Sequence, residues 1–223
     1  MKRIIKKVAV LGSGVMGSRI ACHFAGIGIP VLLLDRAPSE LNETEKAKNL
    51  SPDHPAVKNR IVNEALSATI KSNPSPLYTH DAIKKIGTGN FTDNLRDLGD
   101  YDWIIEVVVE RLDIKAGLFA EVEKYRRPGT LISSNTSGIP IHLMTAGRSD
   151  DFKNIFAAHI FLIRRVICGC WKSFPPQTPI RKFSNSCCIS EISTLEKPPC
   201  FVRTVPHLLP TGLEFSVLWR FSD

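Results

Sequence analysis

Residues 8–21 read VAVLGSGVMGSRIA, and this stretch decides the fold. Its apolar start belongs to a run over 7–11, and a second apolar run follows at 31–34. Buried parallel strands have this continuous apolar character. Between the two runs, residues 15–28 carry small and apolar side chains at helical spacing. The sequence therefore begins with a predicted strand–helix–strand unit of about thirty residues.

The turn between the first strand and the helix contains three glycines, each with its own expected role. Gly12 permits the tight turn, Gly14 lets the backbone approach a pyrophosphate, and Gly17 lets the helix pack closely on the strand. The helix then offers free amides and a positive dipole end to phosphate groups. The predicted phosphate-binding loop is Gly12-Ser13-Gly14-Val15-Met16-Gly17.

A carboxylate follows at the end of the second strand. Asp35 lies 21 residues beyond Gly14, where a carboxylate accepts hydrogen bonds from the adenosine ribose hydroxyls and repels a 2′-phosphate. This favours NAD over NADP as the cofactor, although the adjacent Arg36 weakens the preference slightly. The alternative interpretation is a cluster of turn glycines with an incidental aspartate.

The rest of the first 159 residues alternates between helical and strand-like segments. A polar stretch over 39–72, interrupted near Pro52, predicts two exposed helices, and a further helix is predicted over 115–125. Such alternation is typical of a doubly wound parallel sheet, the α/β Rossmann architecture. Further strands are predicted over residues 86–91, 103–109, 131–134 and 155–160.

Length and composition limit the class of protein. No run of about eighteen apolar residues exists, so no membrane span is expected. The basic start, 1–7, is interpreted as the lead-in to the first strand rather than a signal peptide, which predicts a cytoplasmic setting. A nucleic-acid partner is not expected, because the first 159 residues have no basic stripe with stacking aromatics.

The composition changes near residue 160. Residues 160–223 hold five of the six cysteines and seven of the fifteen prolines. No stretch of this tail keeps a helical or strand period for long. We therefore divide the chain into a NAD-binding Rossmann domain over 1–159 and an atypical tail over 160–223, which is expected to be disordered or poorly packed. The sheet is thus predicted to be incomplete at its C-terminal strands.

Three motifs give the chain a family resemblance. Beside VAVLGSGVMGSRIA, the stretches IIEVVVERLDIK (104–115) and SSNTSGIPI (133–141) resemble the NAD-binding domain of the 3-hydroxyacyl-CoA dehydrogenases, including bacterial fatty-oxidation enzymes. The resemblance covers residues 7–159. It implies an enzyme of fatty-acid β-oxidation that oxidises the 3-hydroxyl of an acyl-CoA substrate to a ketone and passes a hydride to NAD.

The resemblance also implies individual roles. Glu110 and Lys115 become cofactor contacts, and Asn135 lies on the cofactor side near the nicotinamide and the substrate oxygen. Ser137 becomes the hydrogen-bond donor to that oxygen, and His159 the general base that takes the hydroxyl proton. From the residues alone, Glu110 is a strand-end carboxylate, Lys115 a solvated helix charge, and the segment from Asn135 to Gly138 a turn or helix cap.

The sequence departs from the family directly after His159. The family places a glutamate on the next strand to orient the imidazole, whereas here no carboxylate occurs between His159 and Glu191. The genetic code offers an explanation. If each family codon combines the third base of one tail codon with the first two of the next, Trp171 and Lys172 force GAA, a glutamate codon, twelve positions after His159. We therefore hypothesise that the tail from about residue 160 is an out-of-frame translation.

Two functions remain open from the sequence: a working dehydrogenase, or a truncated NAD-binding remnant without turnover. The helical domain through which family members dimerise is not recognisable in this chain. The tail cysteines, such as Cys168 and Cys170, lack the paired spacing of zinc ligands, so no metal is expected. For coenzyme A, Lys58 and Lys71 are candidate anion partners that match no family motif.

Overall fold

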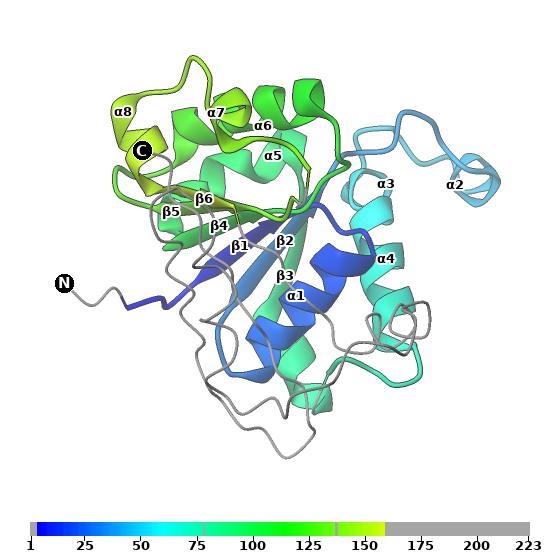
Figure 1. The fold of residues 1–223 in the computed structure, drawn as a ribbon. Helices are drawn as coiled ribbons and strands as arrows, with labels where there is room; N and C mark the ends of the chain where they lie inside the picture. The colour runs from blue at the N-terminus through cyan, green and yellow to red at the C-terminus, as the bar shows by residue number, and fades with distance from the viewer. Residues whose placement is uncertain (1–3, 78, 137, 159–223) are drawn as a thin grey trace, which may run out of the picture.

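The computed structural model describes residues 4–77, 79–136 and 138–158 of the 223-residue chain. Six parallel strands form one sheet in the order β3-β2-β1-β4-β5-β6 (Figure 1). This order and direction are those of a Rossmann sheet, as predicted. The strands are β1 (Val8–Leu11), β2 (Val31–Asp35), β3 (Ile86–Asn90), β4 (Trp103–Glu106), β5 (Leu131–Ser134) and β6 (Phe156–Ala158).

Helices cover both faces of the sheet (Figure 1), which explains why the central strand β1 is apolar throughout. Alternate residues of β1 point into different cores: Val8 and Val10 join one buried cluster, and Ala9 and Leu11 join the other. The first cluster lies under α1 (Val15–Gly26), α4 (Arg60–Ile70) and η1 (His80–Lys85). The second lies under α5 (Phe91–Asn94), η2 (Leu95–Asp100), α6 (Leu112–Tyr125), α7 (Ile141–Met144) and α8 (Asp150–Ile155).

The excursion after β2 contains three helices rather than the two predicted. A short helix, α2 (Glu43–Ala47), starts with a capping box between Asn42 and Glu45. A single turn, α3 (Pro55–Lys58), then precedes α4. Arg60 links α4 to the start of the excursion. Its guanidinium lies 2.6 Å from the Glu45 carboxylate in α2 and donates to the Glu40 carbonyl. The extra helix escapes a periodicity argument because four residues make little more than one turn.

Two element boundaries differ from prediction by three residues. The strand expected over 103–109 ends at Glu106, where the buried carboxylate accepts a hydrogen bond from the Val108 amide and turns the chain out of the sheet. The helix expected from Lys115 starts three residues earlier, at Leu112, and includes Asp113 in its first turn. A carboxylate near a helix N-terminus is favourable, so this earlier start is physically reasonable.

Candidate functional site

The phosphate-binding loop has the geometry predicted for its three glycines. Gly12 adopts a φ of +109°, and a Cβ on it would lie 2.7 Å from the Val107 carbonyl oxygen. A Cβ on Gly17 would lie 1.8 Å from the Gly12 carbonyl oxygen, so no side chain fits between helix and loop. Gly14 is exposed, and a Cβ there would meet no atom within 4 Å. Only Gly14 therefore leaves open space, where the pyrophosphate is expected.

The helix that follows offers its amino end to this space. Gly14 is the N-cap of α1, and no side chain caps the helix there. The first amides of a helix have no partner within the helix, so they remain available to an anion. Val15 is 70% exposed at the open mouth of the loop, whereas Met16 packs against the first buried cluster. Of these two predicted cofactor-binding residues, Val15 is the better placed for side-chain contact with a ligand.

Asp35 ends β2 beside the loop, and Ser13 holds it there. One carboxylate oxygen accepts hydrogen bonds from the Ser13 amide at 2.6 Å and from the Ser13 hydroxyl at 2.5 Å. The other oxygen accepts from the Arg36 amide at 2.7 Å. The carboxylate is half-buried and keeps lone pairs for further donors, so the residues present fit the ribose of NAD. Ser13 belongs to the predicted loop, and the structure gives it the further role of orienting Asp35.

A buried charged cluster lies at the carboxyl ends of β4 and β5. The Lys115 ammonium lies 3.0 and 2.9 Å from the two Glu106 carboxylate oxygens and 3.1 Å from Glu110. Both Lys115 and Glu106 have fully buried side chains, whereas the Glu110 side chain is 43% exposed. Ser134, the last residue of β5, donates a very short hydrogen bond to Glu106. We call Glu106, Glu110, Lys115 and Ser134 the buried charge cluster.

This cluster corrects one interpretation from the sequence. Lys115 is not a solvated helix charge, because α6 turns its side chain inward onto the end of β4. Sequence reasoning also missed Glu106. A carboxylate inside the apolar run over 104–109 was the available signal, since a buried charge requires a partner, and Lys115 follows nine residues later.

Burial and hydrogen bonding shift the pKa values of the two carboxylates of the cluster, Glu106 and Glu110, in opposite directions. Burial raises the pKa of Glu106 above its ordinary value, although the Lys115 charge opposes that shift. For Glu110, the effect of partial burial is outweighed by hydrogen bonds from Thr136 and Lys115, which hold its pKa below the usual value. Glu110 therefore presents an ionised carboxylate at the edge of the sheet.

The segment after β5 carries the remaining predicted site residues. Asn135 is half-buried, and its backbone N–H donates to the Glu106 carbonyl oxygen at 2.8 Å. The Thr136 hydroxyl donates a very short hydrogen bond to Glu110. Ser137 and His159, predicted to contact substrate and to act as base, lie outside the described residues. The structure thus brings Asn135 and Glu110 to one edge of the sheet.

The two lysines considered for coenzyme A differ in environment. Lys58 is engaged within the chain, because its ammonium lies 3.3 Å from Asp53 and 3.2 Å from Asp93. Lys71 is exposed at the end of α4 and borders a concavity of about 490 Å³ on the outer face of that helix. Of the two, only Lys71 keeps the character expected of a residue that receives an anion.

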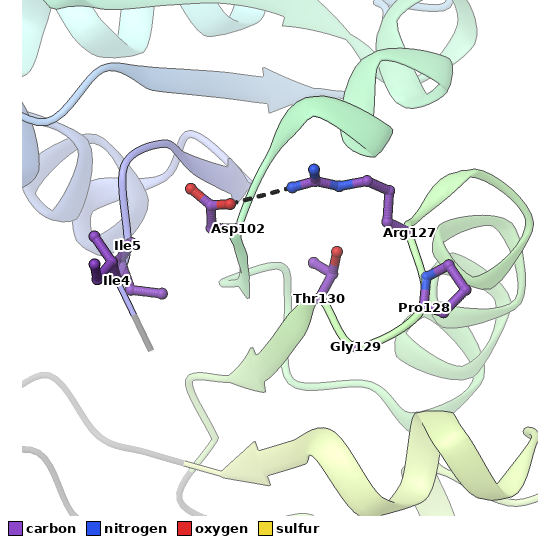
Figure 2. A pocket seen from close by; sticks show the side chains of 7 residues that line it. All are labelled: Ile4, Ile5, Asp102, Arg127, Pro128, Gly129 and Thr130. Atoms are coloured by element: carbon purple, nitrogen blue, oxygen red, sulfur yellow. Dashed lines mark hydrogen bonds and ion pairs between the residues drawn. The ribbon is translucent and has the colours of Figure 1, made fainter. Parts of the chain in front are cut away.

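A pocket at the opposite edge of the sheet is not part of this site. It measures about 250 Å³ and lies at the amino ends of β1, β4 and β5, beside an ion pair between Asp102 and Arg127 (Figure 2). Ligands of parallel sheets bind outside the carboxyl ends of the strands. The residues that line this 250 Å³ pocket are Ile4, Ile5, Asp102, Arg127, Pro128, Gly129 and Thr130.

Two further expectations concern membrane-spanning helices and zinc. Among residues 4–158, apart from the two undescribed positions, no helix is long and apolar enough to cross a membrane. The tail cysteines lie outside the described residues, so the absence of a zinc site there stays a prediction.

Comparison with known proteins agrees with the geometry of the site. Residues 7–163 match the family model described as "3-hydroxyacyl-CoA dehydrogenase, NAD binding domain". The chain is 48% identical over 162 residues to a probable 3-hydroxyacyl-CoA dehydrogenase of Bacillus subtilis, covering 72% of this chain and 20% of that protein. A protein of the same name from Deinococcus radiodurans is 41% identical over 158 residues, covering 70% and 42%. The chain therefore spans less than half the length of these relatives.

Solved structures show the same fold. The crystal structure of Mycobacterium tuberculosis FadB2 is similar with a TM-score of 0.50 and 26% identity, over 72% of this chain and 50% of that one. The dehydrogenase part of multifunctional enzyme 1 from C. elegans has a TM-score of 0.51 at 22% identity, over 72% and 32% of the two chains.

Proposed function

Because this chain belongs to the 3-hydroxyacyl-CoA dehydrogenase family through its NAD-binding domain, we propose that it takes part in the NAD-dependent oxidation of a 3-hydroxyacyl-CoA to the 3-oxoacyl-CoA in fatty-acid β-oxidation. One observation carries the proposal. The open phosphate loop, Asp35, Glu110 and Asn135 all lie at the carboxyl edge of one parallel sheet, in the strand order that binds dinucleotides.

Each described residue has a defined task under this proposal. The amides around Gly14 bind the pyrophosphate, and Asp35, held by Ser13, accepts hydrogen bonds from the adenosine ribose. Asn135 has an amide that both donates and accepts, which suits a position between nicotinamide and substrate oxygen. NAD itself supplies the acceptor for the hydride.

The remaining tasks fall on residues outside the described part of the chain. We assign Ser137 as the donor to the substrate oxygen and His159 as the base that removes the hydroxyl proton, both by resemblance to the family. An imidazole suits that role because its ordinary pKa of about 6.5 lies near working pH. The cytoplasmic setting, the lack of a nucleic-acid partner and dimerisation through a further domain stay predictions.

A second candidate is a NAD-binding remnant that does not turn over. It is favoured by one feature of the sequence: no carboxylate occurs between His159 and Glu191 to orient the imidazole. An unoriented imidazole loses both its tautomer control and its counter-charge, and losing such a partner lowers turnover by about ten-thousandfold in a serine protease.

Two measurements on the full chain separate these candidates. NADH binding is followed by fluorescence, and turnover by the loss of NADH absorbance with acetoacetyl-CoA. A working dehydrogenase does both, and a remnant binds NADH without turnover. His159→Ala is the matched control, because it removes the proposed base and leaves the phosphate loop intact. Absence of NADH binding contradicts both candidates.

A further inference from the structure

The buried charge cluster contains more negative than positive charge. Both oxygens of the Glu106 carboxylate lie within 3.0 Å of the Lys115 ammonium, and one oxygen of Glu110 lies 3.1 Å from the same ammonium. An ammonium this close to a carboxylate favours its ionised form. Two carboxylates therefore share one ammonium, and Ser134, the remaining member, is neutral. The formal charge of the cluster is that of one uncompensated carboxylate.

The uncompensated charge is located at Glu110. Lys115 and Glu106 are fully buried and contact each other through both carboxylate oxygens, whereas the Glu110 side chain is 43% exposed. The second Glu110 oxygen accepts hydrogen bonds from two neutral donors, the Thr136 hydroxyl and the Gly138 amide. Although partial burial opposes ionisation, the bonds from Thr136 and Lys115 hold the pKa of Glu110 below its usual value. Glu110 is therefore ionised at neutral pH.

The two other charged residues between Glu110 and Lys115 do not cancel this charge. Arg111 and Asp113 lie at the start of α6, and their exposed side chains form an ion pair with each other. They add no net charge to the region. The edge of the sheet at β4 therefore presents one net negative charge.

The strand order places this charge in the nicotinamide half of the proposed cofactor site. A dinucleotide lies across the crevice where the strand order reverses, with one mononucleotide on each half of the sheet. Here the order reverses between β1 and β4, and Asp35 at the end of β2 is the proposed partner of the adenosine ribose. Glu106 ends β4 on the other side of β1, so the ends of β4 and β5 face the nicotinamide (Figure 1).

We propose that the buried charge cluster biases the site toward the oxidised cofactor, through the attraction between its net negative charge and the nicotinamide ring. The ring of NAD⁺ carries a positive charge, which it loses on reduction to NADH, while the adenosine and the pyrophosphate stay the same. A nearby fixed negative charge therefore stabilises bound NAD⁺ relative to bound NADH. This inference rests on the proposed function, because an oxidation requires that NAD⁺ is loaded and NADH released, and the cluster favours both.

Replacing a carboxylate of the cluster by an amide of the same shape tests the effect of charge. Glu110→Gln takes the net charge to zero. The ratio of the NAD⁺ to the NADH dissociation constant of the full chain then rises about tenfold, as expected for one partly solvated unit charge within about 10 Å. NADH binding is followed by fluorescence, and NAD⁺ binding by its competition with NADH.

Glu106→Gln removes an equal charge at a side chain that has no exposed surface to offer a ligand. The same ratio rises about threefold, because this carboxylate lies deeper and the Coulomb energy falls with distance. An effect of Glu106 on the choice between NAD⁺ and NADH therefore reports the charge of the cluster and not a contact.

A double variant separates charge from structural damage. Lys115 stays charged in Glu106→Gln, because Glu110 lies 3.1 Å away. Glu106→Gln/Lys115→Met also removes the ammonium and restores the net charge of one carboxylate. Its ratio returns to that of the unsubstituted chain, even though more of the buried contacts are lost. Any hydrogen bond from Lys115 to the cofactor is lost for NAD⁺ and NADH alike, so its loss leaves the ratio unchanged.

Two control variants keep the charge of the cluster. Glu121→Gln makes the same chemical change on an exposed side chain of α6, and Ser134→Ala removes the neutral contact with Glu106. Both keep the ratio of the unsubstituted chain. ADP-ribose, which lacks the nicotinamide, responds to Glu110→Gln as NADH does. An unchanged ratio in Glu110→Gln overturns the inference, and so does a ratio in the double variant that stays as high as in Glu106→Gln.

Failure of the proposed function is seen separately. If the unsubstituted chain binds both dinucleotides without turnover, the proposed function is wrong, while the ratios still decide the effect of the cluster. If it binds neither, both proposals are wrong. Should Glu106→Gln fail to fold, Glu110→Gln decides alone, because its side chain is partly exposed.

Discussion

At the scale of single residues, the three glycines of the phosphate loop differ in the room that each leaves for a side chain. Gly17 has no room for a methyl group, because its Cβ would lie 1.8 Å from a backbone oxygen. Gly14 has open space around it and a φ of −54°, outside the left-handed region that favours glycine. The spacing of the glycines was readable from the sequence. Their separate roles were also predicted from the motif, and the structure adds how little room Gly12 and Gly17 leave for a side chain.

This difference predicts opposite phenotypes for one substitution. Gly17→Ala forces the loop backbone to move and lowers the free energy of unfolding by about 3 kcal/mol, as overpacking does. Gly14→Ala changes stability by less than about 0.5 kcal/mol, as at an open surface position, but weakens NADH binding because its methyl group enters the expected pyrophosphate space. Urea unfolding and NADH fluorescence measure the two effects. Equal loss of stability in both variants would contradict this account.

A second prediction at this scale concerns the choice of dinucleotide. Asp35→Asn removes the charge that repels a 2′-phosphate, while Ser13 continues to contact the side chain. NADH binding weakens by about tenfold, the cost of a hydrogen bond to a neutral instead of a charged acceptor, and the preference for NADH over NADPH narrows. Asp53→Asn, on the exposed excursion, serves as the control. An unchanged ratio of the two affinities would show that Asp35 does not select the cofactor.

At the scale of elements, sequence reasoning did best for the strands β5 and β1. The strand expected over 131–134 has those bounds in the structure, and β1 differs by one residue. Periodicity could not reveal α7 and α8, which have four and six residues. Such short helices depend on contacts between distant residues, and the start of α8 is held by Glu123 of α6. A local pattern carries no information about such a contact.

The contact at α8 predicts a dependence of stability on pH. Partial burial alone would raise the pKa of Glu123, but hydrogen bonds from the Ser149 hydroxyl and amide and the nearby Arg148 and Arg126 charges hold it below the usual value. A carboxyl with a lowered folded-state pKa stabilises fully above its unfolded pKa of about 4.3 and loses that contribution as the pH falls through the folded-state pKa.

Glu123→Gln therefore lowers the free energy of unfolding at pH 7 by about 1.5 kcal/mol, the lower value for hydrogen bonds to a charged group. The loss shrinks below about pH 4.3, where the unsubstituted carboxyl begins to lose its advantage. Thermal unfolding between pH 3 and pH 7 measures both, with the more exposed Glu121→Gln as control. A penalty that stays constant over this range would assign the effect to packing rather than charge.

At the scale of the whole molecule, the chain changes character where its family similarity stops. The family match ends at residue 163, close to the composition change near residue 160. The cofactor half of the proposed site lies before that point, on strands whose order and burial follow from the sequence. By resemblance to the family, the chemical half is expected to use His159 and an orienting carboxylate after it, and the chain has no carboxylate between His159 and Glu191. The hypothesis of a shifted reading frame explains both the end of the family similarity near residue 160 and the lack of a carboxylate after His159.

That hypothesis makes the last prediction. Resequencing the gene across the His159 codon finds a frame in which Trp171 and Lys172 are replaced by a segment containing glutamate twelve positions after His159. A chain translated in that frame reduces acetoacetyl-CoA, whereas the present chain binds NADH with similar affinity and turns over at about a ten-thousandth of that rate, as expected without an orienting carboxylate. Replacing the restored glutamate by glutamine is the matched control, because it removes the charge and returns turnover to the low rate. An uninterrupted reading frame through residue 160, or equal turnover by the two chains, would show that the tail is a genuine part of the protein.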